Sequence, residues 1–199
     1  MSWKNYTRSQ IIALNAIICA FILIFVAFPI QIGLLSLAVV PIIAIIVSTE
    51  TLGVLNGSLT GLFFGIISLI GHLIRPGILS FAFYNPLVSV LPRILIGVSA
   101  YFAAKGVGKL FPKSPQLVQN AVGALCGVLT NTVGVLGMTL LFYFGRPLGE
   151  SGSAIGWEWL AGLLLTNSII EAVVCAVVTP PVVLAVKKVC AQNMRKKKQ

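Results

Sequence analysis

The chain has 199 residues, of which 58% are hydrophobic and 9% charged, and its net charge is +10. Soluble domains carry about 25% charged residues, so this composition excludes an ordinary soluble protein and predicts a single integral membrane domain over residues 1–199. The basic residues stand at the ends of apolar segments. This placement indicates membrane topology and contact with the lipid membrane, and it argues against a nucleic-acid partner.

Six apolar segments predict an all-α integral membrane protein, a bundle of six transmembrane helices. They run approximately over residues 9–28, 34–49, 53–71, 86–106, 117–144 and 158–186. Each is long enough, or nearly so, to cross about 30 Å of hydrocarbon at about 1.5 Å per residue. With six spans both termini lie on one side, and only Arg75, Arg93 and Arg146 of the fourteen Lys and Arg residues fall on the other. The positive-inside rule then predicts a plasma-membrane protein with cytoplasmic termini.

A stripe of small side chains follows one face of the first helix and includes Ala13, Ala16 and Ala20. Ala16 and Ala20 form an AxxxA pair, a spacing that lets another helix approach closely. Two interpretations are open: packing within the bundle, or a docking surface for a separate membrane protein. The short outer loop that follows has Gln31 as its only polar side chain.

The second and third helices carry fewer distinctive side chains. Glu50 ends the second apolar segment and is expected to be a solvated end charge. Gly57, Gly61 and Gly65 form two overlapping GxxxG patterns, which predict close helix packing.

Residues 83–97 begin as a polar-aromatic loop and become an apolar helix with Arg93 about two turns inside it. A buried arginine costs roughly 2.5–3.5 kcal/mol on insertion scales, so it indicates a function. Pro92 should free a carbonyl one turn back and loosen the helix there. The outer loop from His72 to Asn85 is too apolar to extend into water and is expected to cover a ligand pocket, with His72 as an interfacial polar residue. Tyr84 and Asn85 beside a buried arginine suit a small polar ligand.

Polar side chains also lie within the last two helices. Asn131 shares a helix face with Gly123, Gly127 and Gly134, and it either bonds a close neighbouring helix or projects into open space. Asn167 and Glu171 stand four residues apart, on one helix face. At about 1.5 Å per residue these side chains and Arg93 lie some 10 to 20 Å from their helix starts, in one layer. An alternative is an Arg93–Glu171 ion pair that needs no ligand.

Several chemistries are excluded by what the chain contains. Its four cysteines show no CxxC spacing, and its single histidine has no second ligand at metal-binding distance along the sequence. Gly108 and Lys109 lack the upstream glycine of a Walker A motif. The sequence therefore predicts neither an enzyme nor a cofactor or metal site.

The six spans, the AxxxA pair of the first helix and the segment Asn85–Arg93 resemble the substrate-binding S components of energy-coupling factor (ECF) vitamin transporters. The resemblance covers essentially the whole chain and is strongest to the pantothenate-specific subunits. It implies that the chain captures a vitamin outside the cell and associates with a transmembrane coupling protein bound to two cytoplasmic ATPases. It also implies that Ala13, Ala16 and Ala20 meet the coupling protein.

Pantothenate is an anion with two hydroxyls and an amide. Arg93 suits its carboxylate, because a guanidinium can form two parallel hydrogen bonds. The expected partners of its neutral groups are Asn131, Asn167, Asn85, Tyr84 and Gln31, while Glu171 would position Arg93 or accept from a hydroxyl.

Three alternatives remain open. A neutral or cationic vitamin, such as hydroxymethylpyrimidine or another thiamine precursor, would use Glu171 as its anchor. A stand-alone secondary transporter would couple solute to ions through Glu171. A structural membrane subunit would contain only a satisfied Arg93–Glu171 pair.

Overall fold

The computed structural model describes residues 7–28, 31–32, 35–36, 39–77, 79–147, 154–163 and 168–196. Its elements in chain order are α1 (Arg8–Ala27), β1 (Gln31–Ile32), β2 (Leu35–Ser36), α2 (Val39–Leu52), α3 (Val54–Ile74), α4 (Ser80–Phe83), α5 (Pro86–Ser89), α6 (Leu91–Leu110), α7 (Gln116–Tyr143), α8 (Trp157–Leu163) and α9 (Ile169–Lys196). In this described part of the chain, five helices are long and apolar enough to cross a membrane, and α2 is a shorter apolar helix. The expectation of a helical membrane protein is confirmed.

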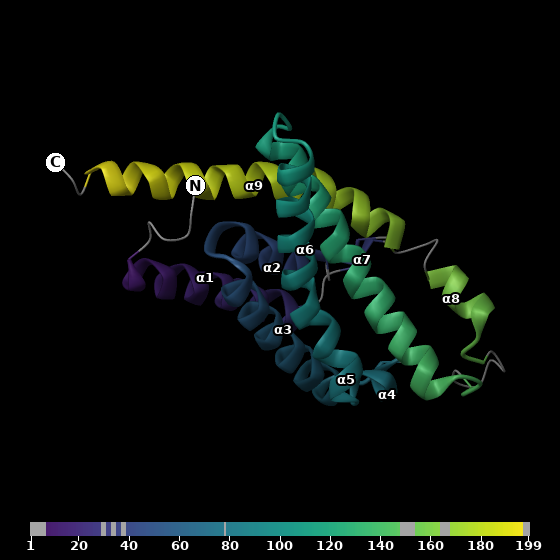
Figure 1. Ribbon diagram of the computed structural model, residues 1–199. Coiled ribbons are helices and arrows are strands. Elements are labelled where there is room, and N and C mark those ends of the chain that lie inside the picture. Colours follow the sequence, from purple (N-terminus) through teal and green to yellow (C-terminus); the bar gives the residue numbers. More distant parts are fainter. Residues whose placement is uncertain are drawn as a thin grey trace.

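Helix α6 occupies the middle of the bundle, where it packs mainly on α7 and α3, while α9 packs on α7 and α2 (Figure 1). Helix α2 lies behind α6 in this view and also contacts α1 and α3. The buried core gathers apolar side chains from α1, α2, α3, α6, α7 and α9. The short helices α4 and α5 close the lower end of the bundle in Figure 1, and the turn from α6 to α7 lies at the top.

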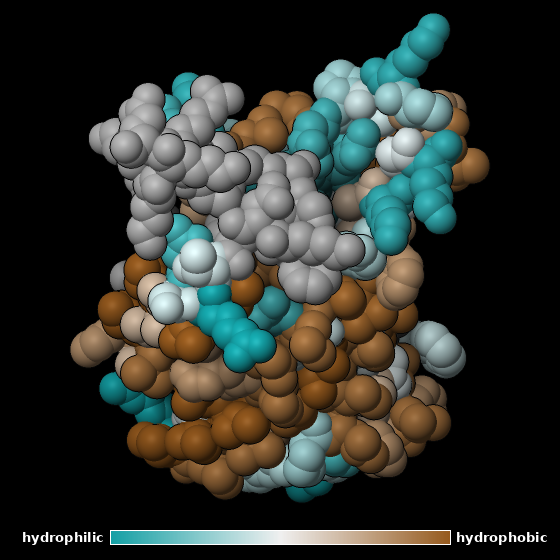
Figure 2. Space-filling view, turned by 60° about the vertical axis from the view of Figure 1, so that its left-hand side comes forward, coloured by the Kyte–Doolittle hydropathy of each residue, from teal (hydrophilic) through white to brown (hydrophobic). Residues whose placement is uncertain are grey.

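The outer surface is largely apolar. Figure 2 shows hydrophobic residues in a broad band over the middle and lower part of one face, and hydrophilic residues gathered at the top, the height of the α6–α7 turn. Large apolar side chains such as Leu55, Phe102 and Leu141 are more than half exposed. A surface of this kind requires lipid rather than water around it.

Glycines set the distance between α3 and its neighbours. A Cβ on Gly61 would overlap the backbone carbonyl oxygen of Arg93, and one on Gly65 would stand 2.7 Å from the Val90 Cα. A Cβ on Gly57 would overlap the Thr49 side chain. The packing role predicted from the GxxxG patterns is confirmed, and it places the α3 backbone directly against the start of α6.

Two features differ from the sequence prediction. The apolar segment 158–186 was expected to be one helix, but α8 ends at Leu163 and α9 begins at Ile169 and continues to Lys196. A continuous apolar run carries no boundary signal of its own, which explains the error. The fold also contains one antiparallel hairpin, in which Gln31 pairs with Ser36 and Ile32 with Leu35. Strands of two residues are too short to leave a periodic pattern in the sequence.

Candidate functional site

Arg93 is fixed at the start of α6 by a carbonyl that Pro92 leaves without a donor. Proline has no N–H, so the Val88 carbonyl, four residues earlier, loses its usual helical partner. Arg93 Nη1 donates to this Val88 oxygen at 2.7 Å. The helix is interrupted at Val90, between α5 and α6. The freed carbonyl predicted from Pro92 is therefore present, and the buried cation itself is its partner.

The Arg93 side chain is only 6% exposed and lies among aromatic rings. Its Cζ stands 5.7 Å from the centroid of Phe64 and 5.1 Å from the centroid of Phe83. Ring contacts of this kind offset part of the loss of hydration. The Nε atom is buried and has no hydrogen-bond partner. An unpaired buried donor costs about 1–3 kcal/mol, a penalty that a ligand acceptor would remove.

The segment around α4, whose Phe83 ring lies against Arg93, is anchored to the end of α3. Ser80 is buried, its Oγ accepts from the Gly77 backbone N–H at 2.7 Å, and it lies 2.9 Å from His72 Nδ1. The His72 ring stacks on Phe83 with centroids 4.3 Å apart and planes 2° from parallel. His72 is therefore part of this packed segment, and its position at the membrane interface stays a prediction.

The same segment is attached to the end of α7 on its other side. The Phe81 ring meets Tyr143 edge-on at 5.2 Å, and Arg146 Cζ lies 4.4 Å from the Phe81 centroid. Tyr84 is 42% exposed. Asn85 caps α5, its Oδ1 accepting from the Leu87 N–H at 3.0 Å. The loop expected to cover a pocket thus contains one short helix, α4, held between α3 and the end of α7.

Asn131 lies on the face of α7 that packs against other helices of the bundle. One turn before it, Gly127 meets Ile96 and Ile46, and three residues after it, Gly134 meets Pro92. Asn131 Oδ1 is buried and has no hydrogen-bond partner. Among the described residues this atom forms no bond to a neighbouring helix, and because it is buried it does not project into open space either.

Glu171 does not pair with Arg93. No ion pair between these two described residues is present within 4 Å, and Glu171 lies in the first turn of α9. The predicted depth of about 20 Å was counted from a helix start near residue 158, whereas the described helix α9 begins at Ile169, so the depth of Glu171 stays a prediction. Asn167 and the side chain of Gln31 lie outside the described residues, so their predicted contacts remain untested.

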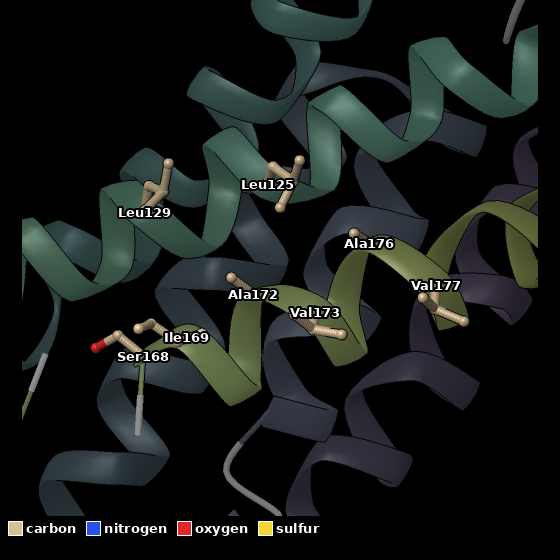
Figure 3. A pocket seen from close by; sticks show the side chains of 8 residues that line it. All are labelled: Leu125, Leu129, Ser168, Ile169, Ala172, Val173, Ala176 and Val177. Carbon is tan, nitrogen blue, oxygen red and sulfur yellow. The ribbon is translucent and has the colours of Figure 1, made fainter. Parts of the chain in front are cut away.

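A groove of about 480 Å³ runs between α7 and α9. Figure 3 shows Leu125 and Leu129 of α7 across from Ala172 and Ala176 of α9, with Ser168 as its polar lining residue. An apolar groove offers almost no hydrogen bonds to a polar vitamin. Neither Arg93 nor Asn131 is among the residues that line it.

The predicted coupling residues Ala13, Ala16 and Ala20 are all exposed. The opposite face of α1 is buried through Ile18 and Ile22. The stripe therefore does not pack against the described part of the bundle, and its role in docking stays a prediction.

Two polar clusters were missed in the sequence. Asn15 of α1 donates to Asn56 Oδ1 at 2.9 Å and accepts from Ser48 Oγ at 3.4 Å, which fixes the rotation of α1. Glu50 is not a solvated end charge, because its Oε1 is buried where a Cβ on Gly123 would stand 2.5 Å away.

Asn120 and Lys187 accompany this carboxylate. Asn120 is fully buried, and with the oxygen and nitrogen of its amide exchanged it would donate to Glu50 Oε2 at 3.2 Å. Lys187 of α9 is the nearby positive charge. The described chain thus contains a second buried polar cluster, formed by α2, α7 and α9.

Comparison with known proteins identifies the group to which this fold and site belong. The family "ECF transporter, substrate-specific component" matches residues 10–183. The pantothenic acid transporter PanT of Lactococcus lactis subsp. cremoris (strain MG1363) is 29% identical over 182 residues, an alignment covering 81% of this chain and 80% of the relative. Since the family match spans most of a helical membrane chain, the protein belongs to the substrate-specific components of ECF transporters.

Proposed function

We propose that this chain captures pantothenate on the outer side of the membrane, with both termini in the cytoplasm. The observation that supports this proposal best is a complementary pair of unpartnered atoms. Arg93 Nε is a buried donor and Asn131 Oδ1 a buried acceptor, on two helices that pack against each other. A ligand with both a carboxylate and a hydroxyl would satisfy both atoms. The similarity to a pantothenic acid transporter supports the same ligand.

Arg93 binds the carboxylate in this proposal, and Asn131 accepts from a hydroxyl or the amide. Tyr84 and Asn85, between α4 and α5, contact the ligand from the outer side of the membrane. Asn167 and Gln31 contribute further neutral hydrogen bonds. Glu171 accepts from a ligand hydroxyl, since it does not orient Arg93.

Equilibrium titration of the purified chain with pantothenate tests this assignment. Arg93→Ala should weaken binding about tenfold or more, which corresponds to about 1.4 kcal/mol. Arg93→Lys should recover only part of the affinity, because an ammonium cannot form the two parallel bonds. Arg75→Ala is the matched control, since Arg75 is exposed and donates to the Ala27 carbonyl at the end of α1. Equal affinity of Arg93→Ala and the parent would contradict the proposed anchor.

Transport requires partners in this proposal: a transmembrane coupling protein and two cytoplasmic ATPases. Ala13, Ala16 and Ala20 form an exposed face of small side chains on α1. Small residues permit close approach of helix backbones within a membrane. The chain carries no Walker A motif, so the hydrolysis of ATP is assigned to the partners.

Ala16→Trp and Ala20→Trp separate capture from transport. We expect each variant to bind pantothenate like the parent as an isolated subunit and to lose ATP-driven uptake in vesicles that contain the full complex. Leu55→Trp is the control, because Leu55 is 71% exposed on α3 and away from this face. If Ala16→Trp and Ala20→Trp lose both pantothenate binding and uptake, the docking role is refuted.

A further inference from the structure

His72 is the only histidine in the chain. It stacks on Phe83, whose ring in turn lies against the Arg93 guanidinium. Ser80 Oγ accepts the Gly77 N–H at 2.7 Å and also forms a hydrogen bond with His72 Nδ1 at 2.9 Å. Ser80 thereby sets the orientation of the His72 ring.

The oriented ring in turn holds Phe83. The two rings are nearly parallel, with planes 2° apart and centroids separated by 4.3 Å. Phe83 is the last residue of α4, a helix of four residues that cannot define a side-chain position alone. His72 belongs to α3, a long helix fixed by its glycine contacts with α6. The position of Phe83 therefore depends on a rigid element through His72.

Phe83 and Phe64 determine which part of the Arg93 guanidinium remains open. Their rings lie within 5.1 and 5.7 Å of Cζ, and Nη1 is occupied by the Val88 carbonyl. The remaining edge is formed by Nε and Nη2, of which Nε has no partner. Two parallel donors on one edge match the two oxygens of a carboxylate. The aromatic cover also excludes water, which strengthens an ion pair made there.

We propose that His72 and Ser80 are positioning residues that hold Phe83 over Arg93 and thereby set the preference of the site for a ligand with a carboxylate. This inference rests on the proposed function, because it concerns the same anchor. Neither residue contacts the ligand in this arrangement. Their effect on binding is therefore specific to the group that meets Arg93.

The test compares pantothenate with pantothenol, in which a primary alcohol replaces the carboxylate. Dissociation constants are measured for the purified full-length parent, His72→Leu, Ser80→Ala and His72→Asn. His72→Leu and Ser80→Ala should weaken pantothenate about tenfold and change pantothenol less than about twofold. His72→Asn should recover part of the loss, because the Asn amide stands near the position of Nδ1 and still forms a hydrogen bond with Ser80. Leu73→Ala, at the exposed neighbouring position, is the control and should change neither ligand.

The ratio of the two dissociation constants distinguishes positioning from general packing. Equal weakening of both ligands would overturn the inference, because it would mean that the substitutions damage the whole site. Unchanged binding of both ligands would overturn it as well. If the parent binds neither compound, the proposed function fails and the inference fails with it. If pantothenate binding depends on Arg93 but not on His72 or Ser80, only the inference fails.

Discussion

Replacing Pro92 with alanine should change ligand affinity and stability in opposite directions, because both depend on the Val88 carbonyl. In the parent this carbonyl accepts from Arg93 Nη1 at 2.7 Å. An alanine supplies the missing N–H, which competes with the guanidinium for the same oxygen. The substitution retains the Cβ, the atom that lies nearest to a Cβ built on Gly134, so the contact of α6 with α7 persists.

The size of each effect follows from the hydrogen bond involved. A net intramolecular hydrogen bond contributes about 0.5–1.5 kcal/mol, so freeing the guanidinium should weaken binding of a carboxylate ligand about 2- to 10-fold. A proline inside a helix costs about 3 kcal/mol relative to alanine. Pro92 is the second residue of α6, where the cost is smaller, so we expect a gain in stability of about 1 kcal/mol or less.

Pantothenate titration and ligand-free thermal unfolding of the same preparation measure the two effects. Pro76→Ala is the control, because Pro76 is an exposed loop residue that precedes α4. Unchanged affinity in Pro92→Ala would show that the freed carbonyl does not fix Arg93. A loss of affinity accompanied by a loss of stability would show general damage and would also refute the reasoning.

Three further substitutions test other contacts of the structure. Asn131→Ala should weaken pantothenate binding about 5- to 10-fold in the same titration, because a ligand donor loses its acceptor; an unchanged dissociation constant would assign Asn131 to packing. Gly61→Ala should destabilise the fold by about 1–3 kcal/mol in thermal unfolding, because its Cβ would overlap the Arg93 carbonyl, and the exposed Gly137→Ala should not. Lys187→Met should lower the unfolding temperature by leaving Glu50 uncompensated, and adding Glu50→Gln should restore it; additive losses would disprove the coupling.

The sequence was sufficient to predict the long helices. Their apolar runs end at charges, Pro or Gly, so α1 spans Arg8–Ala27 against a predicted 9–28, and α7 spans Gln116–Tyr143 against 117–144. The last segment was predicted less well because its apolar composition continues across the junction of α8 and α9. The depth of Glu171 in the predicted layer was calculated from a helix start near residue 158, which is not where the described helix α9 begins.

The candidate site was predictable where its signal is local in the chain. Pro92 predicts the free Val88 carbonyl, because the two residues belong to one helical turn. The glycines around Asn131 predict the close approach of another helix. Arg93 and Phe64 lie far apart in the sequence. His72 and Phe83 are closer in the chain, but their spacing matches no helical or strand repeat. These contacts follow from the way Gly61 and Gly65 bring α3 against α6, which no single stretch of sequence encodes.

Charge compensation distinguishes the site at Arg93 from the buried cluster at Glu50. Glu50 Oε1 also has no hydrogen-bond partner, but Lys187 supplies the opposite charge, and Asn120 would donate to the second oxygen once its amide oxygen and nitrogen are exchanged. Among the described residues Arg93 has no carboxylate partner, and the aromatic rings around it offer no hydrogen-bond acceptors. A buried cation without an anionic partner destabilises the folded protein, and a bound anion would offset this cost. The Glu50 cluster is therefore suited to holding helices together, whereas the site at Arg93 is suited to binding an anionic ligand.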